Sequence, residues 1–179
     1  MVRGLRRAGQ SGVTLIELMM TLSVLGVLIA VAVPYLGDMV RNWRVSSQTN
    51  ELIADLSSAR GQAAGSGVTV TVCASSDGAT CSTTWGTGRI MFTDADGSGA
   101  INGTDQIVRK SGALVEGTTL TVANLSTAGR LQFRPTGMAA GVTGGGATFK
   151  LCDQRSGDFG RLITVAATGR ATSTTATCP

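Results

Sequence analysis

The segment DADGSGAINGTD, residues 94–105, carries oxygen-bearing side chains at intervals that suit a divalent cation. These side chains are Asp94, Asp96, Ser98, Asn102 and Asp105. They hold the first, third, fifth, ninth and twelfth places, and Gly99 holds the sixth, as in a calcium-binding loop. The last place has Asp where such loops have the longer Glu. The alternative is a polar turn whose Asp and Asn side chains bond their own backbone.

A second group of candidate residues is basic and lies in the last third of the chain. After Leu125, six basic residues face two acidic ones, Asp153 and Asp158. The six are Arg130, Arg134, Lys150, Arg155, Arg161 and Arg170. If they share a surface, they would contact DNA phosphates without reading the base sequence, and binding would weaken steeply with salt. A solvated strand face, or pairing with other protein subunits, is the alternative.

The sequence gives little support for a catalytic function. The sequence contains no His, which excludes Ser-His-Asp triads, Cys-His nucleophile pairs and histidine-ligated zinc. No Walker or dinucleotide-binding glycine motif is present. We therefore expect that the protein is not an enzyme, and calcium is the one cofactor for which the sequence gives a reason.

Four cysteines, Cys73, Cys81, Cys152 and Cys178, allow three disulfide pairings. Spacing favours Cys73–Cys81, which closes a short loop, and Cys152–Cys178, which ties down the C-terminus. A four-thiolate zinc site is the alternative, although the chain has no C-x-x-C pair. Disulfides persist in oxidising compartments, which agrees with the non-cytoplasmic side on which the N-terminal segment, described next, places these cysteines.

The elements that position these groups begin with an apolar N-terminal segment. Residues 1–12 are polar and basic, and residues 13–36 are apolar with a single charge, Glu17. As a helix, residues 13–36 would be roughly 36 Å long, which is enough to cross a bilayer. The basic flank predicts a cytoplasmic N-terminus, with the rest of the chain across the membrane. A carboxylate inside a membrane costs about 2.5–3.5 kcal/mol, so we expect Glu17 to be paired.

Helical periodicity continues past Pro34. Apolar residues recur at steps of three or four up to Ala63, with a polar gap at 46–50, and Gly-Ser-Gly at 65–67 ends the pattern. The stripe includes Leu36, Met39, Val40 and Trp43, and Asp55 is among the charged residues expected mostly elsewhere. The sequence thus predicts one helix over 13–64, with 13–36 in the membrane and the remainder on a sheet.

From Val68 onward, seven runs rich in Val, Thr, Ile and Phe alternate with glycine-rich turns. They predict short antiparallel strands, many with one buried and one solvated face. Residues 141–148, GVTGGGAT, are expected to form a hairpin loop. The predicted fold class is therefore α+β: a long helix, transmembrane and then amphipathic, followed by one antiparallel β domain over 65–179.

The residues around Gly12 resemble the cleavage motif of type IV prepilins and type II secretion pseudopilins. GQSG-VTLIEL has Gly12 before the cut, Val13 as the new N-terminus, where Phe is usual, and Glu17 four residues later. Gly26 and Pro34 fall where pilin helices usually carry a flexible Gly and a kinking Pro. The resemblance implies cleavage and N-methylation by a prepilin peptidase. It also implies that Glu17 pairs with the α-amino group of a neighbouring subunit; a plain single-span anchor is the alternative.

The later chain is similar to the GspH/FimT-like minor pilins and pseudopilins. The segments that carry this similarity are 85–99, WGTGRIMFTDADGSG; 106–109, QIVR; and 152–170, CDQRSGDFGRLITVAATGR. The resemblance implies a pilin fold with a single-pass anchor in the inner membrane and a periplasmic globular domain. After assembly with major and minor pilins, the domain would be extracellular, near the tip of a pilus.

Two other roles are consistent with the same resemblance. One is a minor pseudopilin of a type II secretion system. The other is a receptor for double-stranded DNA in natural transformation, because some members of the family bind DNA through a G-R-x-R element. Residues 169–172, Gly-Arg-Ala-Thr, keep the first Arg of that element and have Thr in place of the second.

Overall fold

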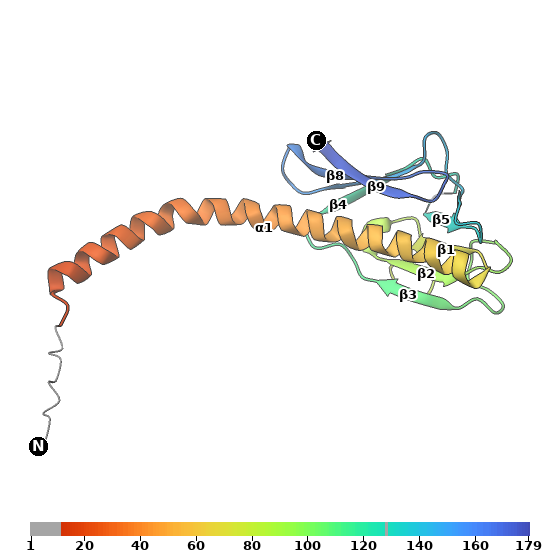
Figure 1. Ribbon diagram of the computed structural model, residues 1–179, viewed down its shortest axis with the longest axis horizontal. Coiled ribbons are helices and arrows are strands. Elements are labelled where there is room, and N and C mark those ends of the chain that lie inside the picture. The colour runs from red at the N-terminus through yellow and green to blue at the C-terminus, as the bar shows by residue number, and fades with distance from the viewer. Residues whose placement is uncertain (1–11, 128) are drawn as a thin grey trace, which may run out of the picture. The chain divides into compact units, whose positions relative to one another are not determined.

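A computed structural model describes residues 12–127 and 129–179, with only the backbone of Pro34. The chain divides into two compact units, Met1–Val40 and Arg41–Pro179, and each is described by itself. Helix α1, Leu15–Ser66, begins in the first unit and ends in the second (Figure 1). Apart from Gly12, the predicted leader lies outside the described residues.

In the first unit, α1 starts with a capped turn. The Thr14 hydroxyl accepts a hydrogen bond from the amide of Glu17 (3.3 Å), the Thr-x-x-Glu pattern of a capping box. The hydroxyls of Thr21 and Ser23 donate to the helix's own carbonyls at 2.9 and 2.8 Å. Among the described residues, α1 alone has the length and apolar composition to cross a membrane.

In the second unit, α1 packs through one face, which the sequence located only in part. Its buried apolar residues are Val45, Leu52, Leu56, Ala59 and Ala63. Polar residues interrupt the apolar stripe at 46–50, yet Gln48 and Thr49 are buried on the same face. Trp43, predicted on the stripe, is 74 % exposed. Residues 45, 48, 49, 52, 55, 56 and 59 repeat at helical spacing, so packing this face buries whatever occupies those positions.

The α+β prediction is confirmed, with two antiparallel sheets after the helix. The five-stranded sheet has the order β3-β2-β1-β5-β6. Its strands are β1 Val70–Ala74, β2 Arg89–Thr93, β3 Ile107–Ser111, β5 Arg130–Phe133 and β6 Ala139–Ala140. The four-stranded sheet has the order β4-β7-β8-β9. Its strands are β4 Thr119–Ala123, β7 Ala147–Cys152, β8 Gly157–Val165 and β9 Ala171–Cys178.

Two strands and a short helix were not predicted from the sequence. β9 consists of Ala, Ser and Thr before its final Cys, so it lacks the large apolar residues that mark a strand. β6 is only two residues long, and the 3-10 helix η1, Trp85–Thr87, is a single turn. The hairpin loop expected at 141–148 is wrong, because β6 and β7 belong to different sheets and the segment crosses between them.

One hydrophobic core joins the second half of α1 to both sheets. Leu52 and Leu56 of the helix share it with Leu131 and Phe133 of one sheet and Phe149 of the other. The Trp85 ring packs edge-on against Phe149, with ring centres 5.0 Å apart. The long helix is therefore the element that holds the two sheets together.

A second, smaller cluster covers the opposite face of β1 and β2. It contains Cys73, Ile90 and Phe92, with Cys81 and Ile101 packed against it. β1 is consequently buried on both faces. The loops that carry Cys81 and Ile101 supply this cover, so they are parts of the fold rather than loose connections.

The structure contains the disulfides Cys73–Cys81 and Cys152–Cys178, which are the pairings that the spacing favoured. The first ties the loop after β1 to the small cluster. The second joins the end of β7 to the end of β9, and so it fastens the last strand of the chain to its sheet.

Candidate functional site

The residues predicted to direct processing and assembly lie at the start of α1. Gly12 and Val13 precede the capped turn, and Glu17 lies within it on the exposed surface of the helix. A carboxylate in the first turn is favoured by the partial positive charge of the helix N-terminus. Pro34 lies inside α1, which continues as a helix on both sides of it.

The side chains around Glu17 form a continuous apolar surface. Every large hydrophobic residue from Val13 to Leu36 is at least half exposed in this unit. Exposed apolar area of this extent marks a surface that another molecule or a lipid phase covers. The first unit is therefore built to be buried against something outside the chain.

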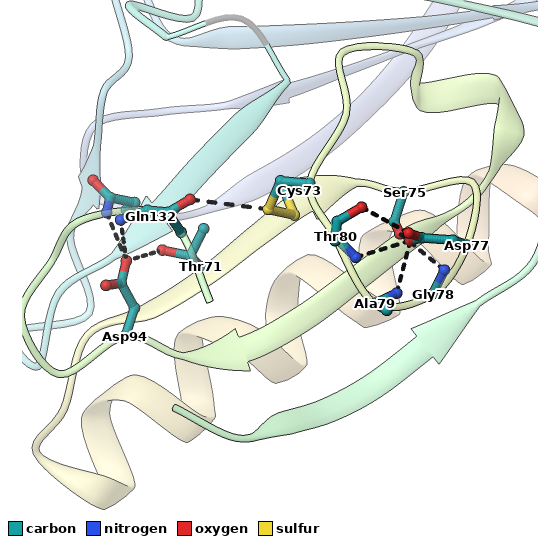
Figure 2. Close-up of a disulfide and its surroundings, with 12 residues drawn as sticks. Thr71, Cys73, Ser75, Asp77, Gly78, Ala79, Thr80, Asp94 and Gln132 are labelled. Atoms are coloured by element: carbon teal, nitrogen blue, oxygen red, sulfur yellow. Dashed lines mark hydrogen bonds between the residues drawn. A yellow bond between two sulfur atoms is a disulfide. The ribbon is translucent and has the colours of Figure 1, made fainter. Parts of the chain in front are cut away.

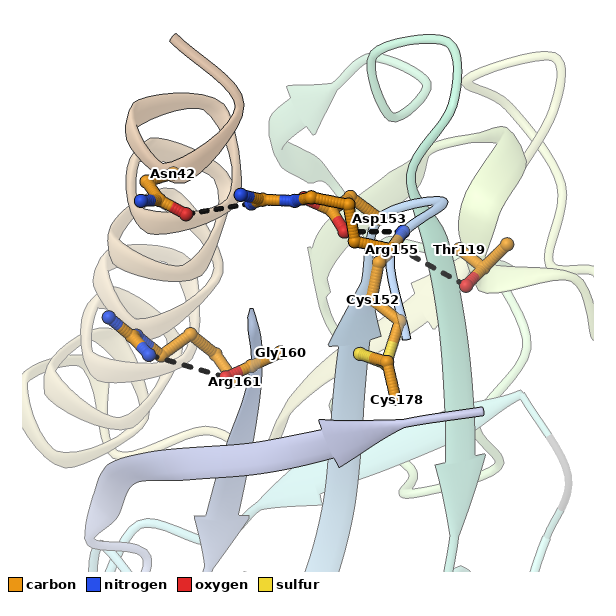
Figure 3. Close-up of polar contacts among 8 residues, drawn as sticks. All are labelled: Asn42, Thr119, Cys152, Asp153, Arg155, Gly160, Arg161 and Cys178. Carbon is orange, nitrogen blue, oxygen red and sulfur yellow. Dashed lines mark hydrogen bonds and ion pairs between the residues drawn. A yellow bond between two sulfur atoms is a disulfide. The ribbon is translucent and has the colours of Figure 1, made fainter. Parts of the chain in front are cut away.

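Arg155 is held in a local network and does not extend into solvent (Figure 3). Its Nε and Nη2 donate to Asp153 Oδ2 at 2.9 and 2.6 Å, and Nη2 also donates to Asn42 Oδ1 at 2.7 Å. Its guanidinium lies 4.1 Å from the centre of the Phe159 ring. Burial raises the pKa of Asp153, but the hydrogen bonds and charge of Arg155 outweigh it, and the net pKa is lowered.

Arg161 and Lys150 point to opposite sides of the four-stranded sheet. Arg161 is paired with the buried Leu151, whereas Lys150 is paired with Leu162 on the neighbouring strand. Since side chains alternate along a strand, Arg161 faces α1, where it borders a groove with Asn42 (Figure 3). The structure therefore does not bring these two predicted residues onto one DNA-binding surface.

Arg134 and Arg170 come from two turns that meet at Gly137, where Arg60 of α1 joins them. Arg60 Nε donates to the Gly137 carbonyl at 3.0 Å. Gly169, at φ +77°, packs so closely that a methyl group there would collide with the same carbonyl oxygen. The three arginines are exposed, and none forms an ion pair with another described residue. We call Arg60, Arg134 and Arg170 the arginine corner.

Arg130 lies apart from the arginine corner, beside the acidic loop formed by residues 94–105. A Cβ built on Gly99 of that loop would come within 3.2 Å of Arg130 Cδ. The six predicted basic residues are therefore dispersed: two lie at the corner, one is tied to Asp153, one faces α1, one is on the outer face of the sheet, and one adjoins the loop.

The acidic loop connects β2 to β3 and is closed at its base. Thr93 N donates to Gln106 O at 2.9 Å, and Gln106 N donates to Thr93 Oγ1 at 2.8 Å. Within it, one carboxylate oxygen each of Asp94, Asp96 and Asp105 lies within 4.8 Å of the others. The loop thus gathers the three acids that the spacing singled out.

Hydrogen bonds from within the loop and from the sheet hold these acids. Asp94 Oδ2 accepts from Thr71 Oγ1 at 2.5 Å, Gln132 Nε2 at 2.9 Å and Gly99 N at 3.0 Å (Figure 2). The backbone N–H of Ser98 is the main cause that lowers the pKa of Asp96 to about 2. Asn102 Nδ2 donates to Asp96 Oδ2 at 3.2 Å and to Ser98 Oγ at 2.9 Å.

A buried ion cluster at Asp55 was missed from the sequence. Asp55 Oδ2 accepts from Arg89 Nε at 2.6 Å and from Ser111 Oγ at 2.8 Å, and Asp55 Oδ1 is 2.8 Å from Arg109 Nε. Arg89 also reaches Glu51 at 2.9 Å. Asp55 was expected mostly off the apolar stripe, whereas it lies on the packed face. The signal that could have identified it is its position three residues after Leu52, which is helical spacing for the packed face.

Comparisons with known proteins agree with this fold. The profile of the type II transport protein GspH family matches residues 48–169, and that of the prokaryotic N-terminal methylation motif matches residues 7–33. No protein with a curated function is significantly similar in sequence.

Two crystal structures of the type IV minor pilin FimU of Pseudomonas aeruginosa, in different crystal forms, share the fold. Both are 22 % identical to this chain, with TM-scores of 0.53 and 0.54. The alignments cover 72 % and 75 % of this chain and 91 % and 88 % of FimU. The minor pseudopilin EpsH of the Vibrio cholerae type 2 secretion system is 13 % identical, with a TM-score of 0.49 over 75 % of this chain and 97 % of EpsH.

The family profile spans most of the chain, including all strands from β1 to β8. The methylation motif covers the start of α1 and contains Gly12, Val13 and Glu17. The chain belongs to the GspH family of type IV minor pilins and pseudopilins and carries a prepilin N-methylation motif.

Proposed function

We propose that this protein is a minor type IV pilin that helps to assemble or initiate a pilus, near its tip. A prepilin peptidase cleaves after Gly12 and methylates the new N-terminus at Val13. The apolar part of α1 anchors the chain in the inner membrane, with the β domain in the periplasm. The apolar part of α1 then enters the filament core. The β domain becomes extracellular and contacts other major and minor pilins.

The observation that carries this proposal is the exposed apolar surface of α1 with one charge, Glu17. A lone carboxylate in an apolar phase is stabilised by an ion partner. A processed neighbouring subunit supplies this ion partner through its α-amino group at Val13. That group lies four residues before the neighbour's own Glu17. This pairing would set the axial register of subunits as they leave the membrane.

The test is a Glu17→Leu variant expressed in cells that assemble the filament. Processing should continue, because Gly12 and the leader are unchanged, whereas incorporation into filaments should be lost. The variant Glu116→Gln removes an exposed carboxylate from the β domain and should assemble normally. Mass spectrometry of the mature chain and immunoblots of sheared filaments measure the two steps. Normal incorporation of the Glu17→Leu chain would contradict the pairing.

A minor pseudopilin of a type II secretion system would use the same helix in the same way. Deletion of the gene distinguishes the two: loss of surface pili indicates a pilin, and loss of protein secretion with intact pili indicates a pseudopilin. In both cases we propose a structural subunit without catalytic activity, consistent with a sequence that contains no His.

Binding of double-stranded DNA is a second candidate function, and the arginine corner favours it. Arg170 belongs to the Gly-Arg element, and the fold adds Arg134 and Arg60 from other segments around Gly137. Exposed guanidinium groups without acidic partners are suited to contact phosphates. The corner therefore supplies additional positive charge where the second Arg of the G-R-x-R element is absent.

A gel shift with the full chain in nonionic detergent tests this function across a salt series. Arg134→Gln and Arg170→Gln should each weaken binding and reduce the slope of log K against log salt by about 0.9. Lys110→Gln removes an exposed charge from β3 and should leave the slope unchanged. Absence of binding at low salt, or equal effects of all three changes, would exclude the corner as a DNA site.

A further inference from the structure

We propose that the acidic loop, residues 94–105, binds one calcium ion through the carboxylates of Asp94, Asp96 and Asp105. This inference does not rest on the role in pilus assembly. It starts from three carboxylate oxygens within 4.8 Å of one another. Like charges at this separation repel, and a divalent cation between them converts repulsion into binding.

The independent observation is a buried oxygen of Asp94 that has no hydrogen-bond donor. Asp94 is fully buried, and its Oδ2 receives all three donors, from Thr71, Gly99 and Gln132. Its Oδ1 is buried without a partner among the described residues. In Figure 2 this second oxygen points away from Thr71 and Gln132. A buried carboxylate oxygen without a donor is costly, and a bound cation would satisfy it.

The charge balance around the loop favours the cation. Within the part of the chain that the structure describes, neither Asp94, Asp96 nor Asp105 forms an ion pair with Lys or Arg. Arg130 adjoins the loop at Gly99, where a Cβ would lie 3.2 Å from Arg130 Cδ and 3.5 Å from Gln132 Nε2.

The donors around the cluster suit calcium better than magnesium. Besides the carboxylates, Ser98 Oγ and the Ala100 carbonyl lie in the same loop, joined by a hydrogen bond of 3.1 Å. Calcium accepts six to eight oxygens in flexible arrangements, whereas magnesium requires a strict octahedron and retains water. With Asp rather than Glu in the last place, we expect a dissociation constant on the order of 10⁻⁴–10⁻³ M.

Calcium would fasten a loop that is already part of the fold. Ile101 of the loop packs on the small cluster beside Cys73 and Phe92. Asp94 itself is bonded to Thr71 of β1 and to Gln132 of β5. The ion would therefore stabilise the outer face of the five-stranded sheet, and its binding is measurable as thermal stability.

The experiment uses the full chain in detergent micelles after removal of metal with EGTA. Titration with CaCl2 should release or absorb heat with a stoichiometry of one ion per chain. At about 100 times the dissociation constant, the melting temperature should rise by roughly 5–10 °C. The same concentration of MgCl2 should produce a smaller shift.

Two variants link any effect to the cluster. Asp96→Asn and Asp105→Asn keep a ligand oxygen and remove one charge, and they should weaken calcium binding about tenfold or more. They are preferred to Asp94→Asn, since Asp94 is buried and its loss could unfold the sheet. Asp77→Asn is the matched control, because Asp77 holds its own separate loop through the Ala79 and Thr80 amides at 2.8 Å (Figure 2).

Three outcomes would overturn the proposal. One is the absence of saturable heat and of a melting shift up to about 10 mM calcium, above the weakest affinity expected for such sites. A second is an equal calcium response in the wild type and both cluster variants. A third is a magnesium response at least as large as that to calcium.

Discussion

At the scale of single residues, a buried ion pair joins Asp55 of α1 to Arg89 of β2. Asp55 and Arg89 are 3 % and 4 % exposed, so each neutralises a charge that water cannot reach. We predict that Asp55→Asn lowers the free energy of unfolding by about 3–5 kcal/mol, because Arg89 would remain buried with only Glu51 beside it. Urea unfolding of residues 41–179 measures this.

The control for this prediction is Glu116→Gln, which removes an exposed carboxylate and should change the free energy of unfolding by less than about 0.5 kcal/mol. The prediction fails if the midpoint for Asp55→Asn equals that of the wild type. A loss as large with the control variant would show that removal of any negative charge destabilises the domain.

The ion pair of Asp153 with Arg155 predicts, at the same scale, that the free energy of unfolding depends on pH. Its folded pKa lies below the unfolded value of about 3.9, mainly because Arg155 opposes the effect of burial. A lowered folded pKa adds stability above the unfolded pKa, and this stability is lost as the pH falls through the folded pKa.

We therefore predict that wild type and Asp153→Asn differ in stability at neutral pH and converge below about pH 4. Urea midpoints measured across this range provide the comparison, and Gln154→Ala serves as the neighbouring control whose difference from wild type should not depend on pH. A constant difference for Asp153→Asn down to the lowest pH would argue against the ion pair as the cause.

At the scale of elements, we expect β9 to depend on its disulfide as well as on its pairing with β8. β9 is an edge strand whose residues are mostly exposed, and Cys152–Cys178 fastens its end across a separation of 26 residues. We predict that replacing both cysteines by Ser costs roughly 3.5 kcal/mol, because the unfolded chain loses a long closed loop. Hydrogen exchange should quicken first in β9.

The Cys73–Cys81 bridge offers the matched comparison, since it closes a separation of only 8 residues. Its removal should cost roughly 2.5 kcal/mol and should quicken exchange in the loop after β1. Equal protection of β9 with and without Cys152–Cys178 would show that strand pairing alone holds it.

At the scale of the whole molecule, the two units differ in what stabilises them. Every residue of both hydrophobic clusters lies at or after Val45, so the second unit contains its own core. The first unit exposes its apolar side chains along the helix. We predict that residues 41–179 fold without the first unit and unfold in one cooperative step, measured by circular dichroism and calorimetry.

The comparison is with the full chain in micelles, whose β domain should melt within a few degrees of the isolated unit. A fragment that lacks cooperative unfolding, or that aggregates on release from a fusion partner, would contradict an independent core. In that case the apolar part of α1 would be required for folding as well as for anchoring.

The sequence by itself determined the features that depend on local pattern. Length and hydropathy identified the apolar half of α1, and period-two runs identified most of the strands. Spacing along the chain singled out Asp94, Asp96 and Asp105, which the loop does gather, and it favoured the cysteine pairs that the structure contains. These properties are readable because each rests on residues near one another in the chain.

Only the tertiary structure decided which distant residues meet. It buried Asp55 against Arg89, because the packed face of a helix carries its polar residues inward with the apolar ones. It dispersed the six basic residues and brought the turns that carry Arg134 and Arg170 together beside Arg60. It also added β9, a strand without large apolar residues that is held by pairing and a disulfide. Such contacts depend on sheet order and side-chain direction, which no single stretch of sequence specifies.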